Sequence, residues 1–228
     1  MRWCRASAGA GRSGRQHRLA CRYACDPTGA ASGSSDVSLI GLFGGSFDPI
    51  HHGHLIVGGA AAEALGLDEL RFMPANEQPF KAGRHSAPAA DRAEMVRLAI
   101  AGMAGFELEA RELDRPGPSY TVDTLRSLHA AEPEHEFVLL LGADAAADIR
   151  LWREPDELLR LARVAVFARP GAPRIEGPAI WRTVPVPSIE ISATAVRDRV
   201  SSGRSVRYWI PDSVADYIVR HRLYLSHV

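Results

Sequence analysis

The stretch GGSFDPIHHGH, Gly44–His54, decides how the rest of the chain is interpreted. The apolar run Ser38–Phe43 precedes it and the small-residue segment Leu55–Leu65 follows it, which indicates a strand, a tight glycine turn and a helix. A turn of this kind places backbone N–H groups and the positive end of a helix dipole beside histidines. Because both features favour an anion, the stretch predicts a phosphate-binding turn.

Two histidines of this stretch are placed to act together. His51 and His54 stand three residues apart at the expected helix start, so they share one helix face and can donate hydrogen bonds to the same phosphoryl group. Gly44 and Gly45 allow the backbone to approach a ligand closely, and Ser46 adds a hydroxyl. The structural alternative is an ordinary glycine turn with solvated histidines. Two histidines without an acid on the same face are a poor zinc set, so no metal site is predicted.

From residue 38 onward, short apolar runs alternate with helical segments. The expected strands are Ser38–Phe43, Glu69–Met73, Phe106–Ala110, Phe137–Leu141, Val164–Phe167 and Thr183–Val186. The expected helices are Gly53–Leu65, Pro88–Met103, Thr121–Ala131, Ala143–Leu151, Pro155–Ala162, Ser192–Ser202 and Pro211–His221. This alternation predicts an α/β, Rossmann-like fold with a mostly parallel sheet flanked by helices on both faces. Ligands of such sheets bind at the carboxyl ends of the strands, where the opening turn lies.

Composition excludes several classes of function. The 228 residues contain 46% hydrophobic residues, enough for a substantial core, and 27 basic side chains balance 27 acidic ones. Net charge therefore gives no support to a nucleic-acid partner, and no apolar run is long enough to cross a bilayer. All three cysteines lie before residue 26, so the domain has no thiol, which fits a reducing compartment. We expect a cytoplasmic protein without a membrane or nucleic-acid partner.

The first 37 residues differ from the rest. They are rich in arginine and small residues and lack the apolar core of a secretory signal. We predict a disordered N-terminal extension over residues 1–37 and one domain over residues 38–228. An organellar transit peptide and translation from an upstream start codon are the alternatives. A zinc site on Cys21 and Cys25 with His17 and Cys4 is a further alternative, but its spacing matches no common zinc module.

The opening stretch resembles the motif of a nucleotidyltransferase superfamily, Gly-x-Phe-Asp-Pro followed by His-x-Gly-His. Gly45–Pro49 and His51–His54 match the two halves of that motif. The resemblance implies transfer of a nucleotidyl group from a nucleoside triphosphate with release of pyrophosphate, and it implies that His51 and His54 contact the triphosphate. The further residues that it places at the ATP site are Gly45, Ser46 and Phe47.

A second match lies near the other end of the chain. Ile191–Arg197, ISATAVR, resembles the superfamily's Ile-Ser-Ser-Thr-x-Ile-Arg, with Ala193 in place of the second serine. It combines hydroxyls and amides at a helix N-terminus with an arginine one turn later, which again suits phosphate. Without the first motif, Ser192 would be interpreted only as a helix N-cap. The resemblance places Ile191, Ser192, Thr194 and Arg197 at the ATP site.

The middle of the chain resembles bacterial nicotinate-nucleotide adenylyltransferases in particular. Pro118–Leu125 is similar to that family's Pro-Ser-Tyr-Thr-x-Asp-Thr segment, and Leu141–Asp144 is followed by Trp152 as in the family. Met73–Lys81 resembles the loop that carries a phosphate-facing lysine. The resemblance covers residues 38–225, and it implies that Gly142 and Asp144 face the nucleoside of ATP.

The same positions suit a nicotinate ring, which offers a flat π-face and a carboxylate. Trp152 can stack on the ring, and groups of Ser119, Tyr120 and Thr121 at a helix start can hold the carboxylate. Lys81 can reach phosphate as a point charge. Ordinary structural roles are open for each: Trp152 as a core aromatic, Thr121 as an N-cap and Lys81 as a solvated loop charge. Arg169 follows a strand and could also face the nucleotide.

The resemblance thus implies the reaction of ATP with nicotinate mononucleotide to give deamido-NAD and pyrophosphate by direct in-line attack. His51, His54, Arg197 and Lys81 would steady the phosphates, and Mg²⁺ would arrive with ATP. Two alternatives stay open: an adenylyltransferase for nicotinamide mononucleotide or pantetheine phosphate, and a non-enzymatic nucleotide sensor. The sequence leaves the oligomeric state open, a homodimer included.

Overall fold

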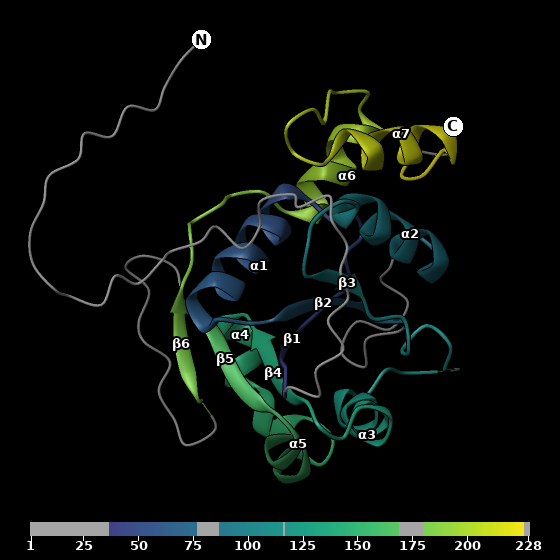
Figure 1. Cartoon of the computed structure of the whole chain (residues 1–228). Coiled ribbons are helices and arrows are strands. Elements are labelled where there is room, and N and C mark those ends of the chain that lie inside the picture. The colour runs from purple at the N-terminus through teal and green to yellow at the C-terminus, as the bar shows by residue number, and fades with distance from the viewer. Residues whose placement is uncertain (1–36, 77–86, 116, 169–179, 226–228) are drawn as a thin grey trace, which may run out of the picture.

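One parallel sheet of six strands, in the order β3-β2-β1-β4-β5-β6, forms the centre of the computed structural model, which describes residues 37–76, 87–115, 117–168 and 180–225 (Figure 1). Every pairing between these strands is parallel, and the order reverses between β1 and β4. The predicted Rossmann-like α/β fold is therefore confirmed. The strands are β1 (Leu39–Gly45), β2 (Glu69–Pro74), β3 (Phe106–Leu108), β4 (Glu136–Leu141), β5 (Arg163–Ala168) and β6 (Arg182–Pro185).

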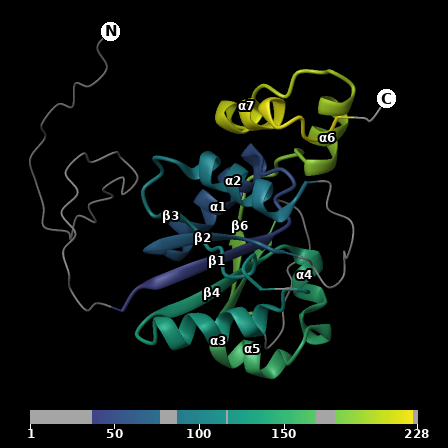
Figure 2. The ribbon, with the colours of Figure 1, turned by 90° about the vertical axis from the view of Figure 1, so that its right-hand side faces the viewer.

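Helices cover both faces of this sheet. Figure 2 shows α1 and α2 on one face, with α6 and α7 beyond them, and α3 and α5 on the opposite face. The helices are α1 (His52–Leu65), α2 (Ala89–Ile100), α3 (Thr121–Ala131), α4 (Ala143–Ala147), the 3-10 turn η1 (Ile149–Leu151), α5 (Pro155–Leu161), α6 (Ala193–Ser201) and α7 (Asp212–Arg220). None of the helices described in this structure is long and apolar enough to cross a membrane.

The alternation of side chains along the central strands explains the two layers. In β4, Phe137, Leu139 and Leu141 pack in the cluster with α3 and α5, whereas Val138 and Leu140 pack in the cluster with α1 and α2. All five of these side chains are buried. A strand that is apolar on both faces is typical of the middle of a parallel sheet. In this sheet β4 pairs with β1, and the two strands end side by side at the carboxyl edge.

The sequence places Val214, Ile218 and Val219 on one face of the last helix and predicts that this face packs on the sheet, but α7 packs differently. Its inward face carries Val214 and Ile218, both buried, but Val219 is 77% exposed and lies on the solvent side. The helix contacts α2 rather than the sheet, and the Tyr217 hydroxyl donates to Asp91 of α2 at 2.7 Å. The expectation of sheet packing was wrong because α2 already covers that part of the sheet (Figure 2).

Two local predictions also need correction. The segment expected as one helix over Ala143–Leu151 divides into α4 and η1, because the N–H of Leu151 bonds to Asp148 O at 2.8 Å and tightens the last turn. Gly44 and Gly45, expected as the turn, are the last two residues of β1. The predictions for residues 1–36, Lys81 and Arg169 concern parts of the chain outside the described residues.

A cluster of charged side chains joins β2 to the end of α3. Both outer nitrogens of Arg71 donate to the two carboxylate oxygens of Glu132, at 2.9 and 2.6 Å. Arg111 donates to the same carboxylate at 3.0 Å. The hydrogen bond from Arg71 lowers the pKa of Glu132 to about 2, although partial burial opposes it and Arg111 assists it. Because a carboxylate at a helix C-terminus faces the negative end of the dipole, Glu132 depends on these arginines.

We predict that Glu132→Gln lowers the free energy of unfolding by about 1–3 kcal/mol at neutral pH, because Arg71 loses its partner in a partly buried site. The difference from wild type should be present above pH 4.5 and shrink as pH falls toward 2, since the depressed pKa means that protonation removes the contribution. Urea unfolding at several pH values measures it. Glu134→Gln is the control, because Glu134 is 55% exposed in its side chain. Equal effects of the two substitutions would contradict the prediction.

Candidate active site

The connection between β1 and α1 is shaped by the ring of Phe47. Phe47 is a non-glycine residue with φ of 45°, and its ring folds back over the end of β1. A Cβ atom added to Gly45 would lie 2.9 Å from Phe47 Cζ. Gly45 is therefore required for packing against Phe47, a reason that the sequence alone did not reveal. Both residues belong to the stretch Gly44–His54 that is expected to bind phosphate.

The two histidines of the turn form a stacked pair. Their ring centroids are 3.6 Å apart and the rings are 18° from parallel. The backbone N–H of His51 donates to Nδ1 of His54 at 3.3 Å. A neutral imidazole carries one N–H, so the ring of His54 holds its proton on Nε2 when Nδ1 accepts this bond. That leaves the Nε2–H of His54 as the donor that this side chain can offer to an anion.

Burial keeps both imidazoles in the neutral form. His51 is 6% exposed, and burial lowers its pKa to about 4, with the charge of His52 adding to the effect against a backbone hydrogen bond that opposes it. Burial, and then the charge of His51, hold the pKa of His54 well below its usual value. The ring of His54 stands edge-on to Phe47 at a centroid distance of 5.0 Å. At neutral pH the pair therefore offers hydrogen bonds rather than positive charge.

Gly53 is the residue that makes room for this pair. A Cβ atom at Gly53 would lie 3.0 Å from Nδ1 of His51. Nδ1 of His51 is itself buried and has no hydrogen-bond partner among the residues that the structure describes. The neighbouring N–H of His52 donates to Trp209 O at 2.9 Å, so this amide at the start of α1 is already used within the protein. At the start of α1, the histidine side chains are therefore better placed than this amide to bind an anion.

The second motif lies against the first. Ser192 is the N-cap of α6, as predicted, and its hydroxyl oxygen accepts the N–H of Ala195 at 3.1 Å. Nη1 of Arg197 donates to the backbone carbonyl of Asp48 at 2.7 Å, across 149 residues of sequence, and Nη2 donates to the Thr194 hydroxyl at 3.2 Å. The start of α6 is therefore fastened to the turn that carries His51 and His54. Ile191, just before α6, packs against the same core cluster.

Sequence reasoning assigned no role to Asp48, although it quoted the residue. The carboxylate is 3% exposed, and its Oδ1 accepts the Ala87 N–H at 3.2 Å and the Tyr224 hydroxyl at 2.7 Å. Burial, and then the charge of Asp48 and this hydrogen bond, raise the pKa of Tyr224 far above its usual value. The C-terminal segment is thus attached to the phosphate turn, a link that no local pattern reveals.

Sequence reasoning also missed Arg92. It is 1% exposed, and its guanidinium donates to the carbonyls of Ser46 at 2.7 Å, Asn76 at 3.0 Å and Ala87 at 3.3 Å. Burial lowers the pKa of Arg92 while the charge of Asp48 opposes that shift. A signal was available in its spacing, since Arg92 precedes Val96 by four residues and so lies on the apolar face of α2. Arg92 orients the carbonyl of Ser46, one of the residues predicted at the ATP site.

The end of β4 lies next to this turn, because β1 and β4 pair up to Phe43 and Leu140. Gly142 follows β4 as the N-cap of α4 and has φ of −69°, a value open to any residue. A Cβ atom at Gly142 would meet no atom of the described residues within 4 Å. Neither packing nor backbone conformation in this structure requires glycine there. Asp144, in the first turn of α4, is exposed at the same edge.

The predicted acceptor residues gather at the start of α3. Tyr120 is the N-cap of α3, and its side chain does not accept a hydrogen bond from the first amides of the helix that Thr121 begins. Tyr120 and Trp152 are half-buried against the same core cluster, at the carboxyl edge of the sheet. The Ser119 hydroxyl, by contrast, accepts the Asn76 N–H at 3.1 Å and is engaged inside the protein.

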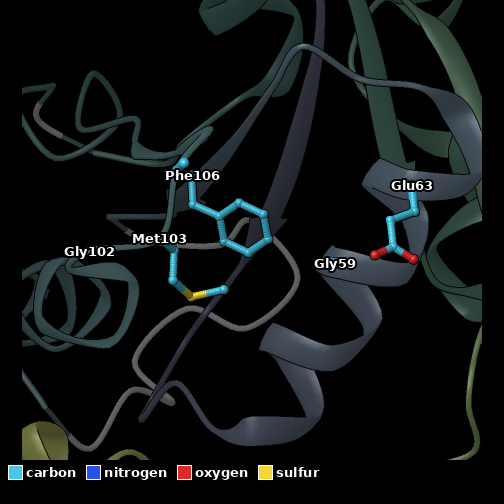
Figure 3. A pocket seen from close by; sticks show the side chains of 6 residues that line it. Gly59, Glu63, Gly102, Met103 and Phe106 are labelled. Carbon is cyan, nitrogen blue, oxygen red and sulfur yellow. The ribbon is translucent and has the colours of Figure 1, made fainter. Parts of the chain in front are cut away.

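Other features of the surface lie away from this edge. A hollow lined by Gly59, Met103 and Phe106, together with neighbouring residues, lies where β3 begins, which is the amino edge of a parallel sheet (Figure 3). No group of three or more histidine, cysteine, aspartate or glutamate side chains in the described part of the chain is placed to hold a metal ion.

Comparison with known proteins defines the class first. The family model described as cytidylyltransferase-like matches residues 42–199 of the chain. The match includes both motifs that Arg197 joins, and with the six-stranded parallel fold it defines the chain as a nucleotidyltransferase of this class.

Curated relatives define the family within that class. A probable nicotinate-nucleotide adenylyltransferase of Roseiflexus sp. is 47% identical over 195 residues, covering 81% of this chain and 97% of the relative. A probable nicotinate-nucleotide adenylyltransferase of Thermus thermophilus is 48% identical over 185 residues, covering 81% of this chain and 98% of the relative. The chain belongs to the nicotinate-nucleotide adenylyltransferase family.

A solved structure shares the fold. The Plasmodium falciparum nicotinic acid mononucleotide adenylyltransferase complexed with NaAD superposes with a TM-score of 0.65 at 20% identity, over 82% of this chain and 97% of that one. At this identity the likeness supports the fold alone.

We predict that Gly53→Ala lowers turnover by about tenfold to a hundredfold, because the added methyl group displaces the His51 ring from its place beside His54. Steady-state kinetics measure the effect. Gly59→Ala is the matched control on the same helix, since its Cβ would lie 3.9 Å from Phe106, an ordinary contact (Figure 3). It should retain activity and gain about 0.5–1 kcal/mol of stability from helix propensity. Equal activity of Gly53→Ala and Gly59→Ala would contradict the prediction that turnover depends on the place of the His51 ring beside His54.

Proposed function

We propose that the protein transfers the adenylyl group of ATP to nicotinate mononucleotide, giving deamido-NAD and pyrophosphate in NAD biosynthesis. Identities of 47% and 48% to the two curated relatives, over almost their whole lengths, support this substrate pair. The observation that carries it structurally is the hydrogen bond from Arg197 to Asp48 O, which brings the two motifs together beside the strand-order reversal. Crevices at such reversals are the ligand sites of parallel α/β sheets.

The triphosphate lies, in this proposal, between the first turns of α1 and α6. Nε2–H of His54 and the guanidinium of Arg197 donate to its oxygens, and His51 supports His54 from the stacked position. Arg197 uses one hydrogen on each of Nη1 and Nη2 inside the protein and keeps further donors on both. Ser46, Phe47, Ser192 and Thr194 line the phosphate path, and Gly142 and Asp144 face the nucleoside. Lys81 assists at the phosphates.

The acceptor occupies the start of α3. The uncapped amides near Tyr120 and Thr121 receive the nicotinate carboxylate, and Trp152 covers the ring. A carboxylate gains from the helix dipole at this place, whereas a neutral carboxamide gains much less, which favours the acid over the amide. Ser119 holds the segment in place rather than touching the ring, because its hydroxyl is bonded to Asn76 N.

The chemistry is a direct displacement. The phosphate of the mononucleotide attacks the α-phosphorus of ATP in line, and the bond to the bridging oxygen breaks to release pyrophosphate. The protein contributes position and neutral hydrogen-bond donors that stabilise the growing negative charge. Mg²⁺ bound to ATP neutralises phosphate charge. In this proposal the ion arrives with the nucleotide and is not held by a cage of protein ligands.

Pyrophosphate release, measured separately with nicotinate mononucleotide and nicotinamide mononucleotide, tests the proposed function. We expect turnover with the nicotinate compound and a much lower kcat/KM with the amide. Faster turnover with the amide or with pantetheine phosphate would assign a different acceptor. ATP binding without pyrophosphate release in the presence of nicotinate mononucleotide, nicotinamide mononucleotide or pantetheine phosphate would mark a nucleotide sensor.

His54→Ala should reduce kcat by about a hundredfold or more while the KM for ATP changes little, because the lost donor acts most strongly in the transition state. Full kinetics with varied ATP separate the two parameters. A variant with near-normal kcat would remove His54 from the catalytic role.

Gly142→Ala should raise the KM for ATP by about tenfold and leave the melting temperature unchanged, because the methyl group enters space that is open in the free protein. Thermal unfolding without nucleotide and kinetics with ATP test the two halves. An unchanged KM for ATP would place the nucleoside away from Gly142.

A further inference from the structure

A buried carboxylate, Glu112, lies behind the start of α3 and has no part in the phosphate chemistry described above. Its exposed fraction is 4%. Thr124, which is fully buried in α3, donates its hydroxyl to Glu112 Oε1 at 3.1 Å. Ser119 also hydrogen-bonds to this carboxylate. Glu112 therefore binds on both sides of Tyr120 and Thr121, the two residues assigned to the nicotinate carboxylate.

The direction of these bonds is defined by their other partners. The Ser119 hydroxyl accepts the Asn76 N–H at 3.1 Å, and the Thr124 hydroxyl accepts Nη1 of Arg115 at 3.2 Å. A hydroxyl has a single proton, so each one that accepts an N–H at its oxygen still has its own proton to donate to Glu112. The carboxylate is thus the common acceptor at which both chains of hydrogen bonds end.

Further contacts tie three backbone segments to this point. Nη2 of Arg115 donates to the carbonyl of Asp123 in α3 at 3.2 Å, and Nδ2 of Asn76 donates to the carbonyl of Arg115 at 2.9 Å. Burial raises the pKa of Glu112, while hydrogen bonds from Thr124 and Ser119 and the charge of Arg115 act against that shift. A buried acceptor with this many partners holds its surroundings rigidly.

Asn76 connects this network to the phosphate turn. Its carbonyl accepts Nη2 of Arg92 at 3.0 Å, and Nη1 of the same guanidinium donates to Ser46 O at 2.7 Å. A continuous path of hydrogen bonds therefore runs from the turn that precedes His51 and His54 to the start of α3. Its two ends lie at the proposed donor and acceptor sites.

We propose that Glu112 is a positioning residue for the acceptor nucleotide, holding the first turn of α3 at a fixed place relative to the phosphate turn. It acts through Ser119 and Thr124 and does not touch substrate. In-line attack is sensitive to misplacement of the acceptor, and an error of about 1 Å can cost about a hundredfold in rate. The inference rests on the proposed function for the identity of the acceptor, but not for the rigidity of α3.

Three variants test the role in the full chain. Glu112→Gln keeps the shape but replaces one acceptor oxygen by a donor, and Thr124→Val removes a hydroxyl at nearly constant volume. Each should raise the KM for nicotinate mononucleotide by about five- to twentyfold with the KM for ATP within about twofold of wild type. Thr124→Ser keeps the hydroxyl and should restore near-normal values. Equal increases in both KM values, or no increase in either, would overturn the proposal.

Amide hydrogen exchange of the free protein provides a readout that needs no substrate. The amides of residues 119–123 should exchange about tenfold faster in Glu112→Gln and Thr124→Val than in wild type, with those of β4 unchanged. Faster exchange throughout the protein, or an unchanged exchange rate at residues 119–123, would leave Glu112 with a packing role only. A wild-type protein that fails to use nicotinate mononucleotide would refute the proposed function, whereas the exchange result would still decide the positioning role.

Discussion

The hydrogen bond from Arg197 to the carbonyl of Asp48 is the contact on which the site depends. It joins residues 149 positions apart and sets the first turn of α6 against the turn between β1 and α1. Without it, two helix starts would each offer a weak anion site. With it, the Arg197 guanidinium is fixed against the turn that carries His54, beside the reversal of strand order. The fold places the turn between β1 and α1 at the carboxyl edge of the sheet, and this hydrogen bond holds the start of α6 against it.

Two buried charged side chains, Asp48 and Arg92, also hold the turn between β1 and α1 in place. The Asp48 carboxylate holds Ala87 N and the Tyr224 hydroxyl, while Arg92 holds the carbonyl of Ser46. Buried polar groups are costly unless each is bonded, so a network like this specifies one arrangement of the loops. Desolvation also lowers the pKa of the two histidines and keeps them neutral at neutral pH.

Much of the fold could be predicted because strand and helix periods are local. Every predicted strand, and six of the seven predicted helices as single elements, occur near their expected positions. The helix predicted over Ala143–Leu151 failed because alanine-rich spacing does not reveal where a last turn tightens. The packing of α7 on α2 depends on which helix covers the sheet first, which no local pattern encodes.

The site divides in the same way. The two motifs brought His51, His54 and Arg197 into the prediction, and the structure stacks His51 on His54 and bonds Arg197 to Asp48 of the same turn. Gly45 was predicted as part of that turn, but its close packing against Phe47 depends on how the turn folds and not on sequence spacing. Helical spacing could have flagged Arg92, whereas the partners of Asp48 and Glu112 come from distant segments. Tertiary hydrogen bonds, unlike periodic burial, leave no trace in sequence spacing.

A crystal structure of the protein with a non-hydrolysable ATP analogue would show whether His54 and Arg197 bind the same triphosphate. We expect the triphosphate between the first turns of α1 and α6, with an oxygen within hydrogen-bond distance of both His54 Nε2 and the Arg197 guanidinium. The Arg197 bond to Asp48 O should remain in place. A triphosphate bound elsewhere, or one that reaches Arg197 only after that bond has broken, would contradict it.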